Sequence, residues 1–124
     1  MTLKELYAAI DGNYDQAISV LRVEKLIDKH IRKFPQGGVT EALLEAGKDM
    51  DPTRLFETSH AMKGVCANLG LMKLSAAASE ISEEFRPGNP RRMTDGQVAD
   101  KLREIEELYR KTAEGIRQYA ESVE

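Results

Sequence analysis

Apolar side chains recur along most of this chain at the three- and four-residue spacing of an amphipathic helix. A short helical segment is expected to begin near Leu3. The spacing then predicts helices over residues 14–21, 22–34, 40–48, 52–69, 72–85 and 94–123. The pattern of 14–21 and 22–34 is also compatible with one continuous helix. No stretch alternates apolar and polar residues in the manner of a half-buried strand. The pattern therefore predicts an all-α protein.

Turn-forming residues separate the predicted helices. Clusters of Gly, Pro, Asn and Asp interrupt the apolar pattern at residues 11–13, 35–38 and 87–90. Asp51 and Pro52 mark a helix start, and Gly70 is placed to end that helix. The loop to the next helix is short, so the two should form an antiparallel hairpin. An antiparallel four-helix bundle with additional short N-terminal helices would bury all of these apolar stripes.

The helix predicted over 52–69 has two different faces. One stripe at 4-3-4-3 spacing is expected to face the core and contains Leu55, Ser59, Met62, Cys66 and Leu69. His60 lies roughly 140° from Leu55 around the helix axis. Lys63 and Gly64 follow one turn later on the side of His60. We therefore expect His60 to be exposed, with Lys63 and Gly64 beside it.

Length and charge narrow the class of protein. The 124 residues fit a single domain spanning 1–124. The net charge of −3 and the absence of tryptophan argue against nucleic acid as a partner. No stretch approaches the roughly 20 apolar residues of a membrane span. The N-terminus lacks the basic start and apolar run of a signal peptide. We expect a monomeric, cytoplasmic protein that does not bind membranes.

The single cysteine and the two histidines limit the metal and redox chemistry. Cys66 has no disulfide partner, and its place on the core stripe predicts a small buried hydrophobe. His30 lies on a different helix from His60 and is expected to have no chemical role. No His-x-x-x-His or Glu-x-x-His ligand pair occurs, so no metal site is expected. Ser59 belongs to the core stripe, which disfavours a Ser–His catalytic pair.

The residues around His60 favour carriage of a phosphoryl group over a metal site or a Ser–His catalytic pair. An imidazole nitrogen can accept a phosphoryl group. Lys63 can offer a cation to the phosphoryl oxygens, and the absent side chain at Gly64 leaves room for a partner's active site. Each residue alone has a simpler interpretation, as a surface histidine, a solvated lysine or a packing glycine. Their occurrence together on one face favours the functional interpretation.

The segment from His60 to Gly64, followed by Leu69 and Gly70, resembles the histidine-containing phosphotransfer (Hpt) domains of two-component phosphorelays. The resemblance covers most of the chain, including a preceding capped helix and a long final helix. It implies phosphorylation of His60, stabilisation of the phosphoryl group by Lys63 and clearance for a receiver domain at Gly64. It also implies that the receiver supplies an aspartate and a magnesium ion, while this chain needs no cofactor of its own.

The same resemblance indicates partners and supporting residues. The expected partners are receiver domains of response regulators or of a hybrid histidine kinase. The chain lacks kinase ATP-binding motifs, so it is expected to be a phosphocarrier without ATP-dependent kinase activity. Many Hpt domains orient the imidazole with a polar residue, often glutamine, on the following helix. This chain has the shorter Ser82 at that position, and Arg86 is a candidate for a basic rim.

Two other interpretations remain open at this point. The chain could be a helical adaptor that binds a receiver or a kinase without being phosphorylated. It could also be an excised or separately encoded phosphotransfer domain of a chemotaxis-type kinase, because those domains share the His-x-x-Lys-Gly pattern.

Overall fold

A computed structural model of the chain describes residues 1–122, and every regular element in this range is helical. The elements are α1 (Leu3–Ala9), α2 (Tyr14–Leu21), α3 (Glu24–Lys33), the 3₁₀ turn η1 (Phe34–Gln36), α4 (Val39–Asp49), α5 (Pro52–Asn68), α6 (Met72–Phe85) and α7 (Asp95–Ser122). The prediction of an all-α helical bundle is confirmed. Val123, which was predicted to continue the last helix, lies outside the described residues. No helix within residues 1–122 is both long enough and apolar enough to cross a bilayer.

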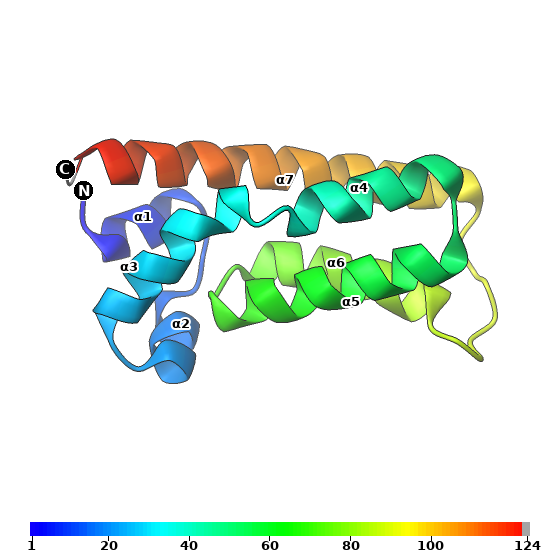
Figure 1. Cartoon of the computed structure of the whole chain (residues 1–124), viewed down its shortest axis with the longest axis horizontal. Coiled ribbons are helices and arrows are strands. Elements are labelled where there is room, and N and C mark those ends of the chain that lie inside the picture. Colours follow the sequence, from blue (N-terminus) through cyan, green and yellow to red (C-terminus); the bar gives the residue numbers. More distant parts are fainter. Residues whose placement is uncertain (123–124) are drawn as a thin grey trace.

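Four of the helices lie side by side along the length of the molecule (Figure 1). Helix α5 packs between α4 and α6, and α7 contacts both α4 and α6. Successive helices of this group, from α4 to α7, run in opposite directions (Figure 1). The short helices α1–α3 pack at one end of this group, where α1 and α3 contact α7 and α2 contacts α5. Helix α5 therefore has neighbours on two sides and keeps one face toward solvent.

The core consists of the apolar stripes expected from the sequence. The predicted inward face of α5 is buried at Leu55, Ser59, Met62, Cys66 and Leu69. Helix α6 contributes Leu74, Ala78 and Ile81, and α7 contributes Val98, Leu102, Ile105, Ile116 and Tyr119. Burial in these apolar surroundings raises the pKa of the Cys66 thiol to about 12, which keeps the sulfur uncharged. Cys66 is thus a core residue, as predicted.

The helical path of the chain is interrupted between α2 and α3. Arg22 has a φ of 75°, outside the right-handed helical region, and Val23 is extended. The alternative of one continuous helix over 14–34 is therefore wrong. The Asn13 side chain caps α2 by accepting the amide N–H of Gln16 at 2.9 Å. The turn at Arg22 lets α3 bury Ile27 and Ile31 against the bundle.

The N-terminal helices hold the C-terminal end of α5. The Tyr7 hydroxyl donates to the carbonyl of Leu69 at 2.6 Å, and the backbone N–H of Asn13 donates to the carbonyl of Gly70 at 2.7 Å. The side-chain amide of Gln16 donates to the carbonyl of Ala67 at 3.3 Å. The last carbonyls of a helix lack partners within the helix, so these bonds complete the end of α5. Gly70 turns the chain there with a φ of 72°.

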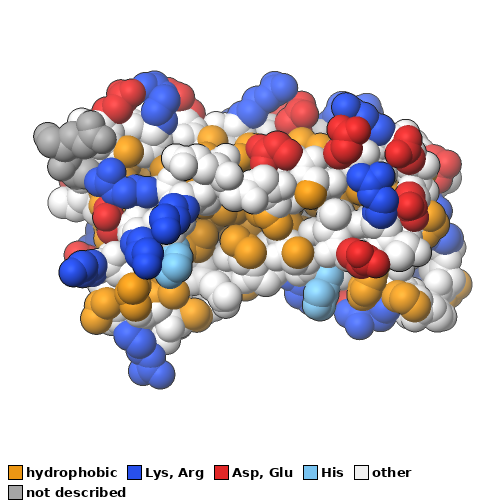
Figure 2. All heavy atoms as spheres, in the orientation of Figure 1, with side chains coloured by type: hydrophobic (Ala, Val, Ile, Leu, Met, Phe, Trp, Pro, Cys, Tyr) orange, Lys and Arg blue, Asp and Glu red, His pale blue; other side chains and the backbone are white. Residues whose placement is uncertain are grey.

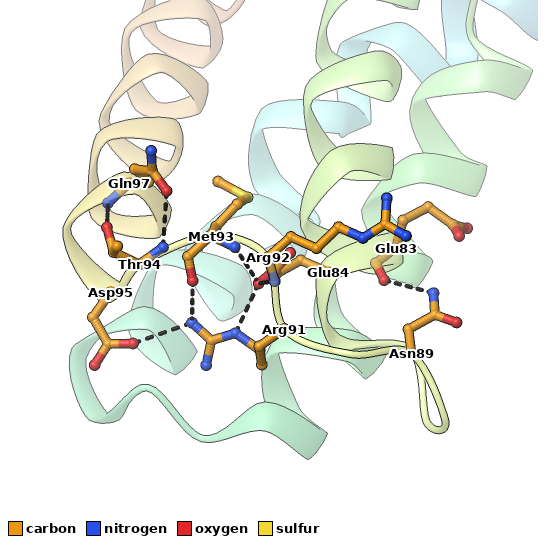
Figure 3. A network of polar contacts seen from close by, with 9 residues as sticks. All are labelled: Glu83, Glu84, Asn89, Arg91, Arg92, Met93, Thr94, Asp95 and Gln97. Atoms are coloured by element: carbon orange, nitrogen blue, oxygen red, sulfur yellow. Dashed lines mark hydrogen bonds and ion pairs between the residues drawn. The ribbon is translucent and has the colours of Figure 1, made fainter.

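One buried carboxylate organises the connection from α6 to α7 (Figure 3). Glu84 accepts the backbone N–H groups of Arg92 and Met93 at 2.9 and 2.8 Å and Nε of Arg91 at 2.8 Å. Burial alone would raise the pKa of Glu84, but these bonds together hold it below its usual value. Thr94 and Gln97 then cap α7 reciprocally, each accepting the other's backbone N–H. The prediction that Thr94 caps the last helix is confirmed.

Candidate functional site

Helix α5 presents His60 and Gly64 to solvent, with Lys63 partly buried beside them. The two exposed residues are four positions apart, so they lie on one side of the helix, one turn from each other. The opposite stripe, from Leu55 to Leu69, is buried. The predicted exposure of His60 and the predicted burial of the core stripe are therefore both confirmed.

Gly64 has open space where a side chain would be. A Cβ added at this position would meet no atom within 4 Å outside its own helix backbone. The contrast with two other glycines within helices is clear. A Cβ at Gly47 would collide with Leu102, and a Cβ at Gly115 would collide with Ile10. Those two glycines allow close helix packing. An interior glycine costs a helix about 1 kcal/mol relative to alanine. Close packing does not explain why Gly64 is a glycine.

Lys63 carries a cation on the turn that follows His60. Its ammonium forms no ion pair in residues 1–122. Its charge acts on Glu83 of α6. The pKa of Glu83 is lowered mainly by the hydrogen bond from Arg86 and to a smaller extent by the charge of Lys63. The backbone of Lys63 is held in place, because its carbonyl accepts the hydroxyl of Ser75 at 3.1 Å.

The imidazole of His60 stacks on the ring of Phe56. Their ring centroids are 5.6 Å apart and the ring planes meet at 24°. No hydrogen bond to the imidazole occurs within residues 1–122, so this stacking is the contact that orients the ring. The sequence pattern did not single out Phe56. The available signal was an aromatic residue four positions before His60, a spacing that brings two side chains together on a helix.

Ser82 and Arg86, the two residues expected to support the site from α6, behave differently. Ser82 is fully buried, and its hydroxyl has no hydrogen-bond partner among the described residues. It does not hold the imidazole in this structure. The guanidinium of Arg86 lies 5.9 Å from the centre of the Phe56 ring and pairs with Glu83 at 2.6 Å. Arg86 therefore reaches the surroundings of His60 by way of Phe56.

A groove of about 350 Å³ lies between the C-terminal end of α5 and the segment from α3 to the start of α4. Its lining includes Leu21, His30, Phe34, Val39, Val65 and Asn68. Figure 2 shows hydrophobic side chains along the hollow between α5 and the α3–α4 side, with Lys and Arg side chains gathered at α3. His30 is exposed on α3 and lies at this groove, on a different helix from His60.

Comparison with known families identifies the class of the chain. The family model described as the Hpt domain matches residues 36–119, which is more than half of the sequence. The chain belongs to the Hpt domain family. Searches of curated proteins and of solved structures find no match. The resemblance inferred from His60, Lys63 and Gly64 is thus confirmed at the level of the family.

The Hpt match gives the general role of the family. Hpt domains carry phosphoryl groups on histidine in two-component phosphorelays and are phosphocarriers rather than kinases. They interact with receiver domains of response regulators and with kinases. The matched segment begins in η1 and ends in the last turns of α7, so helices α1–α3 lie outside it.

Proposed function

We propose that this protein accepts a phosphoryl group on His60 and exchanges it with an aspartate of a receiver domain. The observation that carries the proposal is the open space at Gly64 next to an exposed imidazole. Of the three glycines compared above, Gly64 is the one without a packing role, and it lies one turn from His60. Clearance at this point is what in-line transfer between two proteins requires.

The transfer step involves one bond formed and one bond broken. An unprotonated imidazole nitrogen of His60 attacks the phosphorus of the receiver's aspartyl phosphate. The new N–P bond forms as the O–P bond breaks, and the aspartate is left as a carboxylate on the receiver. The reverse step returns the phosphoryl group to an aspartate. A magnesium ion on the receiver, not on this chain, offsets the charge of the transferring oxygens.

The residues around His60 have separate parts in this step. Lys63 lies one turn away and its ammonium compensates the negative phosphoryl oxygens. Gly64 gives the receiver's active-site loop access. Arg86 adds positive charge at the edge of the site, although Glu83 holds it in the unphosphorylated protein. Ser82 is too deeply placed to contribute through a hydrogen bond to the imidazole.

The test is transfer of radiolabelled phosphate from phosphorylated receiver domains encoded by the same genome. We expect label to appear on this chain and to be lost in acid but retained in base, as a phosphoramidate requires. His60→Gln should abolish the label, while His30→Gln should keep it. A helical adaptor would bind the receiver and gain no label. Label that persists in His60→Gln would move the phosphorylation site to another residue.

A further inference from the structure

A second exposed surface lies on α2 and α3, the helices that the family match leaves out. Three of the six large hydrophobic side chains exposed in residues 1–122 flank the turn between these helices: Val20 is 40%, Val23 50% and Leu26 39% exposed. A fourth, Val65, is 40% exposed on α5 and lines the groove, whereas Val20, Val23 and Leu26 lie outside its lining. Apolar side chains gathered in this way mark interaction sites. The α2–α3 surface is defined here by Val20, Val23, Leu26 and Val65 together with Arg22, Lys25, Lys29 and Lys33.

The cations of this surface are unneutralised. Lys25, Lys29 and Lys33 are spaced four residues apart and form one row along α3. Neither these lysines nor Arg22 forms an ion pair in residues 1–122. Like charges four residues apart destabilise a helix, so the row is not there to stabilise α3.

The acidic residues of α3 face other partners. Glu24 accepts the hydroxyl of Tyr14, and Asp28 accepts both the hydroxyl of Tyr119 at 2.5 Å and Nε of Arg32 at 2.9 Å. Neither acidic residue of α3 therefore pairs with the lysine row, on a chain whose net charge is −3. Lys33 lines the apolar groove, and Lys29 and Lys25 continue the row along α3 beyond it. An apolar groove with cations leading from one edge is complementary to an apolar face with an acidic flank.

We propose that the α2–α3 surface binds an amphipathic helix of a partner protein. The apolar face of this helix enters the groove beside Val65, and its acidic flank lies along Lys25, Lys29 and Lys33. A concave groove of about 350 Å³ suits the ridge of anchors that a helix presents every three or four residues. A lipid surface would leave such a groove unfilled.

This docking is separate from the chemistry of His60 and goes beyond the proposed phosphotransfer. Val65 directly follows Gly64 in the sequence, but it points roughly 140° away from His60 around α5. A helix bound in the groove therefore holds its parent protein on a different side of α5 from the His60 face. Helices α2 and α3 add one wall and the lysine row to a groove whose other wall belongs to the segment matched by the family model.

The test uses two synthetic helical peptides with the same apolar face, one with glutamates and the other with lysines along its flank. Binding to the full chain is measured by fluorescence anisotropy at low and moderate salt. We expect the acidic peptide to bind, to weaken as salt rises and to bind His60→Gln equally well. The basic peptide should bind at least about tenfold more weakly.

Matched variants locate the surface. Lys29→Glu with Lys33→Glu should weaken the acidic peptide about tenfold, and Val65→Ser, in the groove itself, should weaken it independently of salt. Lys33→Glu alone should weaken binding more than Lys111→Glu, an equal charge change on α7. Equal binding of both peptides, no binding of either peptide, or equal effects of Lys33→Glu and Lys111→Glu would overturn the proposal. Tighter association with anionic vesicles than with the acidic peptide would also overturn it. Loss of labelling in the transfer assay would leave these results unchanged.

Discussion

The ring of Phe56 lies against the imidazole of His60, with centroids 5.6 Å apart and an interplanar angle of 24°. The two residues are one helical turn apart on the exposed face of α5. Since the imidazole has no hydrogen-bond partner within residues 1–122, the phenyl ring limits the orientations that it can adopt. Orientation of a nucleophile is worth a large part of a transfer barrier.

Phe56→Leu should therefore slow transfer to His60 without unfolding the protein. Phe56 is only partly buried, so we expect a loss of stability of about 1 kcal/mol, and a loss in transfer rate on the order of tenfold. Phe56→Tyr keeps the aromatic face and should transfer at nearly the parental rate. The measurements are transfer rates and the proton NMR shifts of the His60 ring, which lose their ring-current component in Phe56→Leu. Unchanged shifts and rates would show that the stacking has no influence.

Gly64→Gln should separate folding from function. Removal of an interior helix glycine stabilises the helix by up to about 1 kcal/mol, and the new side chain meets no atom of the protein near its Cβ. The same side chain projects beside His60, and a displacement of about 1 Å can cost on the order of a hundredfold in transfer rate. Thermal melts and transfer rates with one receiver measure the two effects.

Gly115→Ala is the control for this experiment. Its Cβ would collide with Ile10, so it should lower stability and leave the transfer rate of the folded protein unchanged. Parental transfer by a stable Gly64→Gln protein would show that no clearance is needed at position 64.

Lys63→Ala should reduce the transfer rate or the lifetime of the phosphohistidine more than it weakens binding to the receiver. The substitution removes the ammonium that compensates the phosphoryl oxygens but leaves the surface at Gly64 open. A charge-assisted contact of this kind is worth about 1.5–3 kcal/mol, which corresponds to roughly ten- to hundredfold in transfer rate or phosphohistidine lifetime. Dissociation constants for the unphosphorylated protein should change by less than threefold. Lys111→Ala on α7 is the matched control, and an equal effect of both variants would refute the assignment.

Glu84→Gln should lower stability and flatten its pH dependence. The folded-state pKa of Glu84 lies below its unfolded value, so its contribution is fully present above the ordinary carboxyl pKa. That contribution is lost as the pH falls through the lowered folded-state pKa. Loss of charge-assisted bonds to Arg91, Arg92 and Met93 should cost about 1–3 kcal/mol at neutral pH.

Urea unfolding at neutral and acidic pH measures this effect. Glu107→Gln, at an exposed site on α7, is the control and should change stability by less than about 0.5 kcal/mol. A stability difference between parent and Glu84→Gln that stays constant as the pH falls would contradict the role given to the carboxylate.

The sequence predicted the elements that have strong local signals. Asp51 and Pro52 begin α5 and Met72 and Phe85 bound α6, as expected, because caps and apolar spacing act within a few residues. The break between α2 and α3 was left open, since no glycine or proline marks it. Arg22 adopts its positive φ because Ile27 and Ile31 gain burial against the bundle, which is a tertiary effect.

The candidate site, too, was predictable from the sequence only in part. The exposure of His60 and Gly64 follows from their angular positions on one helix. The stacking of Phe56 depends on a rotamer that the sequence does not specify, and the isolation of the Ser82 hydroxyl depends on the packing of α6 against its neighbours. The open space at Gly64 is a property of everything that surrounds it, so only the structure distinguishes it from Gly115.

The bonds from Tyr7, Asn13 and Gln16 to the end of α5 bear on how this module can be moved between proteins. A fusion cut at residue 36, where the family match begins, would carry His60 with it but would leave behind the groups that complete its helix. The carbonyls of Leu69 and Gly70, just past the end of α5, would then lose these hydrogen bonds, while Ala67 would still accept the backbone N–H of Gly70. A fusion protein that is meant to keep the end of α5 intact should therefore include the first 35 residues.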